Sequence, residues 1–401
     1  MFNPARQYCD WPANYACPGG GGGGGGGPAP APPPVAPPAS PSPVPAPPPS
    51  PTPPGPPSPS PPPAPPAPPP PSEPAPAPAN ALLPSNGKNL VVGYYQTWTS
   101  PWASTGANLD LSRTPSHVNV VILSFAKPDC AYAKGSLLLG GTGLDFSSDG
   151  AVVRAAVRSL KTTNPGTRVL LAVGGATYTN FARLNMQCVV DLVADLGLDG
   201  ADIDYEPASP ACQRLGGGGV RCATDAESVD VVAKFRAAMP KGRYILSTAS
   251  WHVGCYGAGA WTSAQPTFSQ YFGVNLAMAR SAAGQSLDLI NIMAYDAGGP
   301  QSPANSPTGF SWRESFLSTR AAWPSAAVAL GVEVPPEAWG GFVSDEADVR
   351  ARADFAMANG GAGLMVWSLQ KPGTPSPRAV ASIACAKFGT CSTAAWPFPG
   401  S

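Results

Sequence analysis

The strongest constraint on the fold is an alternation of short apolar runs with longer helical patterns along most of the chain. The runs are almost continuously apolar, which is typical of strands buried on both faces of a parallel sheet. Eight runs in roughly 300 residues, with helical segments between them, predict an α/β protein with a (β/α)8 TIM barrel. A doubly wound open sheet is the alternative, but no GxGxxG loop follows the first run, which counts against dinucleotide binding.

The expected elements are defined by these runs. The expected strands are Leu90–Tyr95, Val118–Phe125, Arg168–Val173, Gly200–Tyr205, Tyr244–Ala249, Leu287–Ala294, Ala327–Glu333 and Gly363–Ser368. The expected helices between them include Gly150–Thr162, Asn180–Leu196, Ala223–Met239, Thr267–Ala283 and Asp345–Asn359.

Composition divides the chain into four parts. Residues 1–18 hold aromatic residues and two cysteines, and residues 19–85 form a linker rich in glycine and proline. Such a linker cannot pack a core and favours polyproline II conformation, so we expect it to be disordered. Residues 86–393 carry the alternating pattern and form the expected barrel, and residues 394–401 form a short tail.

Charge and hydropathy exclude two classes of partner. The 24 basic and 24 acidic residues cancel, and no basic block interrupts the chain, which argues against nucleic-acid binding. No apolar run reaches the ~18 residues that a membrane helix needs, so we expect no membrane partner. The residues that follow Met1 lack an apolar core, so a signal peptide is apparently missing from this chain.

The nine cysteines lack the paired CxxC spacing of a zinc site. Three pairs of cysteines lie close together in the sequence: Cys9 with Cys17, Cys212 with Cys222, and Cys385 with Cys391. Such pairs suit disulfides in an oxidising compartment, and free buried thiols are the alternative. Because the count is odd, one cysteine must stay unpaired, and Cys130, Cys188 and Cys255 are the candidates for the remainder. The chain has only two histidines, so we expect no metal and no cofactor.

The stretch LDGADIDYEP, Leu198–Pro207, places four carboxylates on what otherwise reads as a buried strand, in a chain with 12% charged residues. Side chains alternate along a strand, so Asp202, Asp204 and Glu206 share one face. Asp199 lies an odd number of residues from these three acids, so its side chain falls on the other face unless a β-bulge occurs at Gly200. In a barrel the shared face points inward and ends at the carboxyl-end mouth, where active sites lie.

Three carboxylates on one buried face repel one another and lose hydration, so at least one pKa must rise. An acid kept protonated near neutral pH can donate that proton. Glu206, nearest the mouth, is the expected donor, while Asp204 would orient a substrate group and Asp202 would help to set the charge of Asp204. A solvated edge strand or a calcium loop is the alternative, although Ile203 and Tyr205 favour a strand.

The run Asp199–Glu206 resembles the DxxDxDxE signature of the family 18 glycoside hydrolases, the chitinase family. Other strands agree with this resemblance, which covers about residues 88–385. Val92–Tyr95 with Trp98 resembles the family's first strand, Leu171–Gly175 its third-strand SxGG, Met293–Asp296 its sixth-strand MxYD, and Met365–Ser368 its eighth strand.

The resemblance implies substrate-assisted hydrolysis of β-1,4-linked N-acetylglucosamine, with retention of configuration. Glu206 would protonate the glycosidic oxygen and later act as base on water. The sugar's own 2-acetamido carbonyl would attack C1, while Asp204 accepts a hydrogen bond from the acetamido N–H. Tyr295 would bind the acetamido oxygen, Asp296 would contact the sugar, and Trp367 would stack on its apolar face.

The full set of expected site residues follows from the resemblance. The catalytic residues are Glu206, Asp204, Asp202 and Tyr295, and the substrate-binding residues are Tyr94, Asp296, Met293, Trp367, Trp98 and Trp251. Trp102, Trp312 and Trp339 are further candidate sugar platforms, although aromatic side chains mostly serve packing. The implied partner is chitin or a chito-oligosaccharide, bound by a monomer.

Two features bear on how well the chain would work as such an enzyme. The third strand carries Ala172 where the family often has serine, so we expect one supporting contact to Asp202 to be lost. This predicts reduced activity or a shifted acid limb of the pH profile. The seventh strand reaches Asp345 in about a dozen residues, too few for an additional α+β subdomain, so we expect a shallow, open cleft.

The first residues carry a second resemblance. Phe2–Cys17, with Cys9, Trp11 and Cys17, resembles the C-terminal half of a peritrophin-A type chitin-binding module. Such modules need six cysteines. Either the chain begins midway through the module, or its upstream part was lost from the gene model. The latter would also explain the missing signal peptide. A chitin-binding remnant tied to a barrel would raise the local concentration of the catalyst on an insoluble polymer.

Two other functions fit the same signature. One is an endo-β-N-acetylglucosaminidase that acts on N-glycans, and the other is a non-catalytic chitin-binding lectin on the same barrel. Lectins of this kind usually lack the acid, and Glu206 is present. The cysteine pairs and the resemblance indicate an extracellular protein, secreted or in a cell wall.

Overall fold

The computed structural model describes residues 81–216, 219–262, 270–297, 310–338 and 343–398, together with two short paired strands near the start of the chain. These strands, β1 (Phe2–Asn3) and β2 (Tyr8–Cys9), are antiparallel. Trp11, Cys17, the side chain of Cys9 and most of the expected linker lie outside the described residues, as does Trp339.

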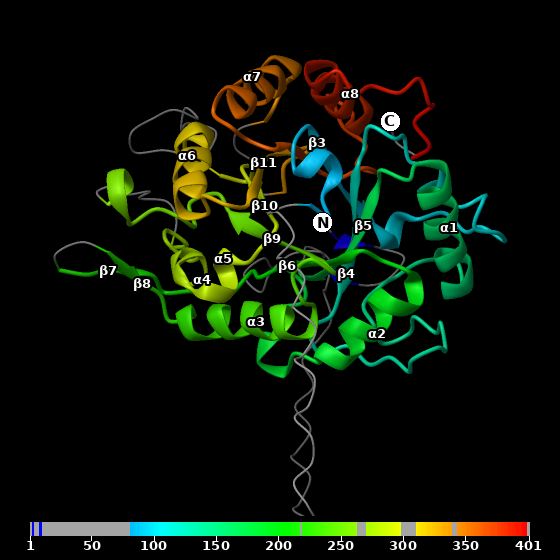
Figure 1. Ribbon diagram of the computed structural model, residues 1–401, viewed down its shortest axis with the longest axis horizontal. Helices are drawn as coiled ribbons and strands as arrows, with labels where there is room; N and C mark the ends of the chain where they lie inside the picture. Colours follow the sequence, from blue (N-terminus) through cyan, green and yellow to red (C-terminus); the bar gives the residue numbers. More distant parts are fainter. Residues whose placement is uncertain are drawn as a thin grey trace, which may run out of the picture.

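Eight parallel strands close into a barrel, which confirms the predicted (β/α)8 fold and excludes an open sheet (Figure 1). The strands follow one another around the barrel in chain order. They are β3 (Leu90–Gln96), β4 (Val120–Ala126), β5 (Arg168–Gly174), β6 (Gly200–Asp204), β9 (Ile245–Trp251), β10 (Leu289–Met293), β11 (Ala327–Glu333) and β12 (Gly363–Trp367). Every expected strand is present, and no end is shifted by more than two residues.

Helices surround the strands in the same order (Figure 1). They are α1 (Gly150–Thr163), α2 (Met186–Leu196), α3 (Asp225–Ala238), α4 (Leu276–Arg280), α5 (Ala282–Gln285), α6 (Trp312–Ala322), α7 (Glu346–Ala358) and α8 (Pro377–Phe388). Short 3-10 helices lie at Pro84–Asn86, Thr97–Thr99, Asp110–Arg113, Phe181–Arg183 and Gly259–Trp261. Among the described helices, none is both long and apolar enough to cross a lipid bilayer.

Local capping explains where two helix predictions were wrong. The Asn185 side chain accepts a hydrogen bond from the Cys188 N–H, so α2 begins after Asn185 and not at Asn180. The single helix expected over Thr267–Ala283 is two short helices in its described part. Ser281 has an extended backbone and its side chain accepts from Gly284 N–H, which ends α4 and starts α5.

Two concentric apolar layers follow from the alternation of side chains along the strands. An inner cluster fills the barrel, with residues such as Val92, Ile122 and Leu170. An outer cluster, with neighbours such as Val91 and Val121, lies between the strands and the helices. This double burial is why the strands read as nearly continuous apolar runs.

Both expected boundaries of the barrel domain shift outward. Leu83 is 3% exposed and belongs to the inner cluster, so the folded part begins before residue 86. Near the other end, Phe398 is 3% exposed and its ring meets Tyr95 edge-on at 5.7 Å between centroids. The described part of the expected tail is therefore packed on the barrel, because its aromatic residues bury apolar surface there.

Three disulfides lie in the described residues: Cys130–Cys188, Cys212–Cys222 and Cys385–Cys391. Two of the three expected close pairs are confirmed, and the third, Cys9 with Cys17, lies outside the described residues. Of the three remaining candidates, Cys255 is the buried free thiol. Cys212–Cys222 closes a hairpin that the sequence did not predict, formed by β7 (Gln213–Arg214) and β8 (Val220–Arg221) in the connection after β6.

We expect the Cys130–Cys188 disulfide to contribute most to stability, because it closes the longest loop. It spans 58 residues, and loop-closure entropy predicts that replacing both cysteines by serine lowers the free energy of unfolding by about 4 kcal/mol. The same change at Cys385 and Cys391, which are 6 residues apart, serves as the control and should cost about 2 kcal/mol. Urea unfolding of both variants measures the difference, and equal losses would contradict the loop-length explanation.

Candidate active site

The acids of β6 occupy both ends of the strand. Asp202 and Asp204 are 0% and 3% exposed and point into the barrel, and Glu206 follows at the mouth, where it is partly exposed. Asp199 lies apart from them at the amino end, where its carboxylate accepts from Lys161 Nζ at 2.7 Å and from Val169 N–H at 2.8 Å. We call Asp202, Asp204 and Glu206 the acid row; Asp199 belongs to the barrel floor.

Asp202 is held by polar side chains from three other strands. The Tyr94 hydroxyl donates to Oδ2 at 2.9 Å, and the Ser247 hydroxyl donates to Oδ1 at 2.5 Å. The Asn291 amide lies farther away, 3.5 Å from Oδ1. Burial raises the pKa of Asp202 to about 6, and the hydrogen bonds from Ser247, Tyr94 and Asn291 oppose that rise. Tyr94 is 2% exposed and supports Asp202 through this hydrogen bond, and its expected contact with substrate stays a prediction.

Asp204 and Glu206 form a pair that retains a proton. Burial raises the pKa of Asp204 well above its usual value, and the charges of Glu206 and Asp202 raise it further. Burial also raises the pKa of Glu206 to about 7, with the charge of Asp296 adding to the rise and a hydrogen bond to Asp204 opposing it. The acid row therefore keeps a proton near neutral pH, as expected for crowded carboxyls.

Glycines bring β5 close to the acid row. Gly174 has φ +111°, and a Cβ there would lie 2.1 Å from the Asp204 carbonyl oxygen. The Gly175 N–H donates to that same oxygen at 2.8 Å, and the Ala176 backbone N–H donates to the Glu206 carboxylate. Only glycine fits at Gly174, because an L side chain would be strained by that φ and would clash with β6.

The carboxyl end of β10 supplies the opposite side of the mouth. Tyr295 follows two residues after Met293, the last residue of β10, and both side chains pack against the inner cluster. The charges of Asp204 and Glu206 contribute to raising the pKa of Tyr295, after burial and Glu333. The Tyr295 phenol is therefore close to the acid pair and stays protonated, so it can donate a hydrogen bond there.

Aromatic rings gather at the ends of β12, β3 and β4. Trp367, the last residue of β12, stacks on Phe125 at 5.6 Å and meets Tyr94 edge-on at 5.8 Å. Trp98 stacks on the same Phe125 at 6.0 Å. The structure thus brings Trp367 and Trp98 together, with 6.3 Å between their ring centroids. The sequence analysis missed Phe125, although it ends the expected second strand at the same mouth.

The other expected sugar platforms differ in position. Trp251, the last residue of β9, stacks on Tyr271 with 3.8 Å between ring centroids, so Tyr271 covers one of its faces. Trp102 is 70% exposed on the connection after β3, at the mouth end. Trp312 lies in α6, is 2% exposed and donates to Asp348, so the expectation that it forms a platform was wrong. Its ring serves packing between helices, because it meets Phe355 of α7 edge-on with 5.4 Å between ring centroids.

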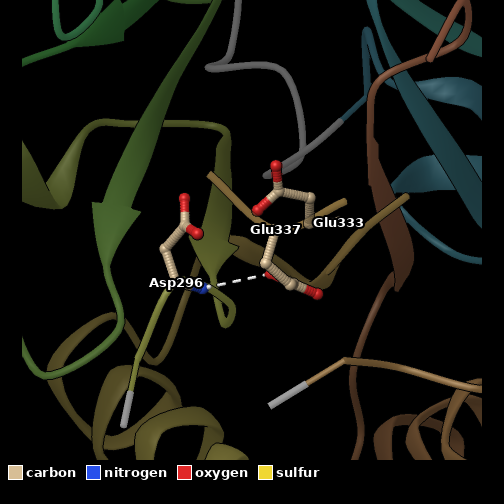
Figure 2. Close-up of side chains that lie close together, drawn as sticks. All are labelled: Asp296, Glu333 and Glu337. Carbon is tan, nitrogen blue, oxygen red and sulfur yellow. Dashed lines mark hydrogen bonds between the residues drawn. The ribbon is translucent and has the colours of Figure 1, made fainter. Parts of the chain in front are cut away.

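Three acids meet beside Tyr295 and form what we call the rim cluster: Asp296, Glu333 and Glu337 (Figure 2). The Asp296 N–H donates to Glu337 Oε2 at 3.4 Å, the dashed line in Figure 2. Glu333 ends β11 with 0% exposure and is paired with Lys371. Burial and then the charge of Asp296 raise the pKa of Glu333 to about 10, and Lys371 opposes this rise.

The rim cluster is the ligand set among the described residues that suits a cation. Its carboxylate oxygens lie within 4.8 Å of one another, and hard divalent cations prefer such oxygens. The Lys371 ammonium already binds Glu333 and also donates to the Pro336 carbonyl at 2.8 Å. The expected absence of a metal stays a prediction. Glu333, Glu337 and Lys371 were not predicted as a group, because Glu333 ends β11, Glu337 lies in the connection after it and Lys371 lies in the connection after β12.

We expect the charge of Asp296 to set the basic limb of a pH–rate profile. Glu206 must be protonated to act as an acid, so activity should fall as pH rises through its pKa of about 7. Removing the negative charge in Asp296→Asn should lower that pKa and move the basic limb of kcat/KM down by about one pH unit. Asparagine also tolerates the φ of +50° at this position.

Asp230→Asn is the control for this measurement, because Asp230 is an exposed residue of α3 paired with Lys234. The Asp230→Asn variant should leave the basic limb of the kcat/KM profile at the same pH as in wild type. A profile of Asp296→Asn that overlays wild type on the basic side would show that Asp296 does not act on Glu206 through its charge.

Comparisons with known proteins agree with this arrangement. A family model described as "Glycosyl hydrolases family 18" matches residues 90–333. A curated relative, a chitinase of Plasmodium falciparum (isolate 3D7), is 33% identical over 133 residues. The match covers 30% of this chain and 33% of that relative, so the chain spans about a third of the length of the curated relative it matches.

A solved structure supports the fold. A family 18 chitinase from Pseudoalteromonas aurantia superposes with a TM-score of 0.50 at 17% identity and covers 75% of this chain and 100% of that chain. A family 18 chitinase from Cycas revoluta in complex with (GlcNAc)3 superposes with a TM-score of 0.49 at 16% identity and covers 75% of this chain and 100% of that chain.

Proposed function

Because the chain belongs to the family 18 glycosyl hydrolases, we propose that it hydrolyses β-1,4 linkages of chitin with retention of configuration, by substrate-assisted catalysis. The observation that carries this proposal is the acid pair at the carboxyl end of β6, where Glu206 is partly exposed and Asp204 lies buried behind it. Tyr295 lies close to both acids, and Trp367 ends β12 at the same mouth.

The separation of the acids bears on the reaction. Inverting glycosidases keep two carboxyls roughly 6.5–9.5 Å apart so that a water fits between them. Glu206 and Asp204 lie close enough that their side-chain interaction shifts the pKa of both groups, which leaves no room for that water. Asp204 is also 3% exposed, so its carboxylate is poorly placed to attack C1 itself. A nucleophile supplied by the sugar's 2-acetamido group fits this geometry.

The roles then follow from position and protonation. Glu206 donates its proton to the glycosidic oxygen, and the leaving sugar departs as the acetamido oxygen bonds to C1. Asp204 accepts a hydrogen bond from the acetamido N–H and stabilises the positive charge of the oxazolinium ion. Tyr295 donates to the acetamido oxygen and helps to align it for attack. Glu206 then removes a proton from water, and the water oxygen attacks C1 and opens the oxazolinium ring. This step returns Glu206 to its protonated form.

The proposal also covers the aromatic side chains on which sugar rings would stack and the compartment in which the protein would act. Trp367 and Trp98, which both pack against Phe125, offer apolar faces to sugar rings. Asp296, Met293 and Trp251 are proposed as further contacts on the β10 and β9 side of the mouth. The three described disulfides support an oxidising, extracellular environment. Chitin binding by the residues around Trp11 stays a prediction.

Product analysis on two substrates tests the function. Chitin hexamer should give shorter N-acetylglucosamine oligomers, and the new reducing ends should appear first as the β anomer. A high-mannose glycoprotein is the comparison substrate and should remain intact. Release of its glycans with an uncut hexamer would assign the N-glycan reaction instead. Tight hexamer binding without any cleavage would assign a lectin.

A further inference from the structure

We propose that Ser247 on β9 is a positioning residue for the reaction, which holds the Asp202 carboxyl in place of the hydroxyl that β5 lacks at Ala172. This inference rests on the proposed function, because Asp202 matters to catalysis only through Asp204 and Glu206. It assigns a role to a serine that no sequence motif singled out.

The register of the barrel places both positions beside Asp202. Ala172 on β5 pairs with Asp202 on one side, and Ser247 on β9 pairs with Asp202 on the other. Neighbouring strands lie roughly 4.8 Å apart, so either side chain is within reach of the carboxyl when it points inward. Ala172 belongs to the inner cluster and has no hydroxyl, whereas the Ser247 hydroxyl donates to Oδ1 at 2.5 Å.

Nothing else among the described residues replaces this bond. Asp202 and Ser247 are both 0% exposed. The Tyr94 hydroxyl serves the other oxygen, Oδ2. The Asn291 amide lies 3.5 Å from Oδ1, which is at the outer limit of a useful hydrogen bond. Without Ser247, Oδ1 would keep only this long contact.

The groups that face Asp202 determine how it titrates. Asp204 on the same strand and Tyr94 on β3 are the titratable neighbours, while β5, β9 and β10 present Ala172, Ser247 and Asn291. None of these supplies a positive charge, so hydrogen bonds alone offset the loss of hydration. Ser247 makes the largest of these offsetting contributions. A carboxylate that loses such a donor becomes harder to ionise, and its pKa rises.

The test is the acid limb of the kcat/KM profile on chitin hexamer. Ser247→Ala should move this limb up by about 1–2 pH units, because a hydrogen bond to a charged group is worth that much in pKa. At pH 5, kcat/KM should fall about tenfold or more relative to wild type. Ser247→Thr, which keeps the hydroxyl, should retain the wild-type limb.

Matched variants separate positioning from packing. Ser250→Ala removes another fully buried serine of β9, but Ser250 lies on the opposite face, with its hydroxyl near the Asn275 amide at 3.4 Å. It should leave the acid limb unchanged. Adding Ala172→Ser to Ser247→Ala moves the hydroxyl from one neighbour of Asp202 to the other and should restore the limb. Ala172→Ser alone should change the profile little, because Oδ1 already has a close donor.

Three outcomes would overturn the proposal: an unchanged limb in Ser247→Ala, an equal shift in Ser250→Ala, or no restoration by the added Ala172→Ser. If Ser247→Ala does not fold, the double variant still decides the matter. Titration of Asp202 by carbon NMR gives a readout without activity. If wild type cleaves no hexamer, the proposed function fails, while an upward shift of the Asp202 pKa in Ser247→Ala would still support the contact.

Discussion

Glu206→Gln should lower kcat on chitin hexamer by about 10³-fold or more while the affinity for the hexamer stays close to wild type. Glutamine keeps the size and one oxygen of the side chain but cannot donate the proton that the leaving sugar needs. It also cannot serve as base in the second step, so both halves of the reaction are slowed. Quenching of tryptophan fluorescence by the hexamer measures binding, and product analysis measures cleavage.

Glu227→Gln is the control for that variant. Glu227 lies on α3 and accepts a hydrogen bond from the Tyr205 hydroxyl at 2.6 Å, outside the acid row. Its replacement keeps an acceptor oxygen and should leave kcat within about twofold of wild type. A Glu206→Gln variant that cleaves at a rate near wild type would remove Glu206 from its role as the acid and with it the proposed mechanism.

Asp204→Asn should lower kcat by roughly 10²-fold, chiefly by weakening the stabilisation of the positively charged intermediate. The neutral amide cannot balance the oxazolinium charge, and its NH2 group can face the acetamido N–H as a second donor. Asp204 is buried, so its charge acts through a low dielectric and matters more than an exposed charge would. The loss should appear in kcat more than in KM, because the charge develops only after the substrate is bound.

Asp199→Asn offers a control from the same acidic motif. Asp199 pairs with Lys161 and accepts from the Val169 N–H at the opposite end of the barrel. Its change should lower the melting temperature and leave kcat nearly unaffected. If Asp199→Asn and Asp204→Asn reduced kcat equally, the effect of Asp204 would come from folding and not from its place beside Glu206.

The four acids of the motif illustrate what spacing can and cannot predict. Period-two alternation put Asp202, Asp204 and Glu206 on one face, and the structure places them so. The same reasoning left Asp199 out of phase, and its partners Lys161 and Val169 could not be read from the sequence. They come from α1 and β5, 38 and 30 residues away along the chain.

Ala172 is a second example of a contact that could not be predicted from the sequence. The sequence revealed a missing hydroxyl at this position and predicted a weaker support of Asp202. The structure puts Ser247, 45 residues beyond Asp202 in the chain, in the neighbouring register position, where its hydroxyl reaches Asp202. Ser247 and Asn291 were visible as polar residues in apolar strands, but which strands flank β6 is a property of the closed barrel.

The sequence by itself determined the eight strands, the strand that carries the acids and the face on which they lie, because these depend on local periodicity and on apolar content. Tertiary structure alone decided which side chains complete the site: Ser247 at Asp202, Phe125 against Trp98 and Trp367, and the rim cluster with Lys371. The physical reason is that barrel closure sets contacts between strands far apart in sequence, and the pKa of a buried acid depends on those contacts.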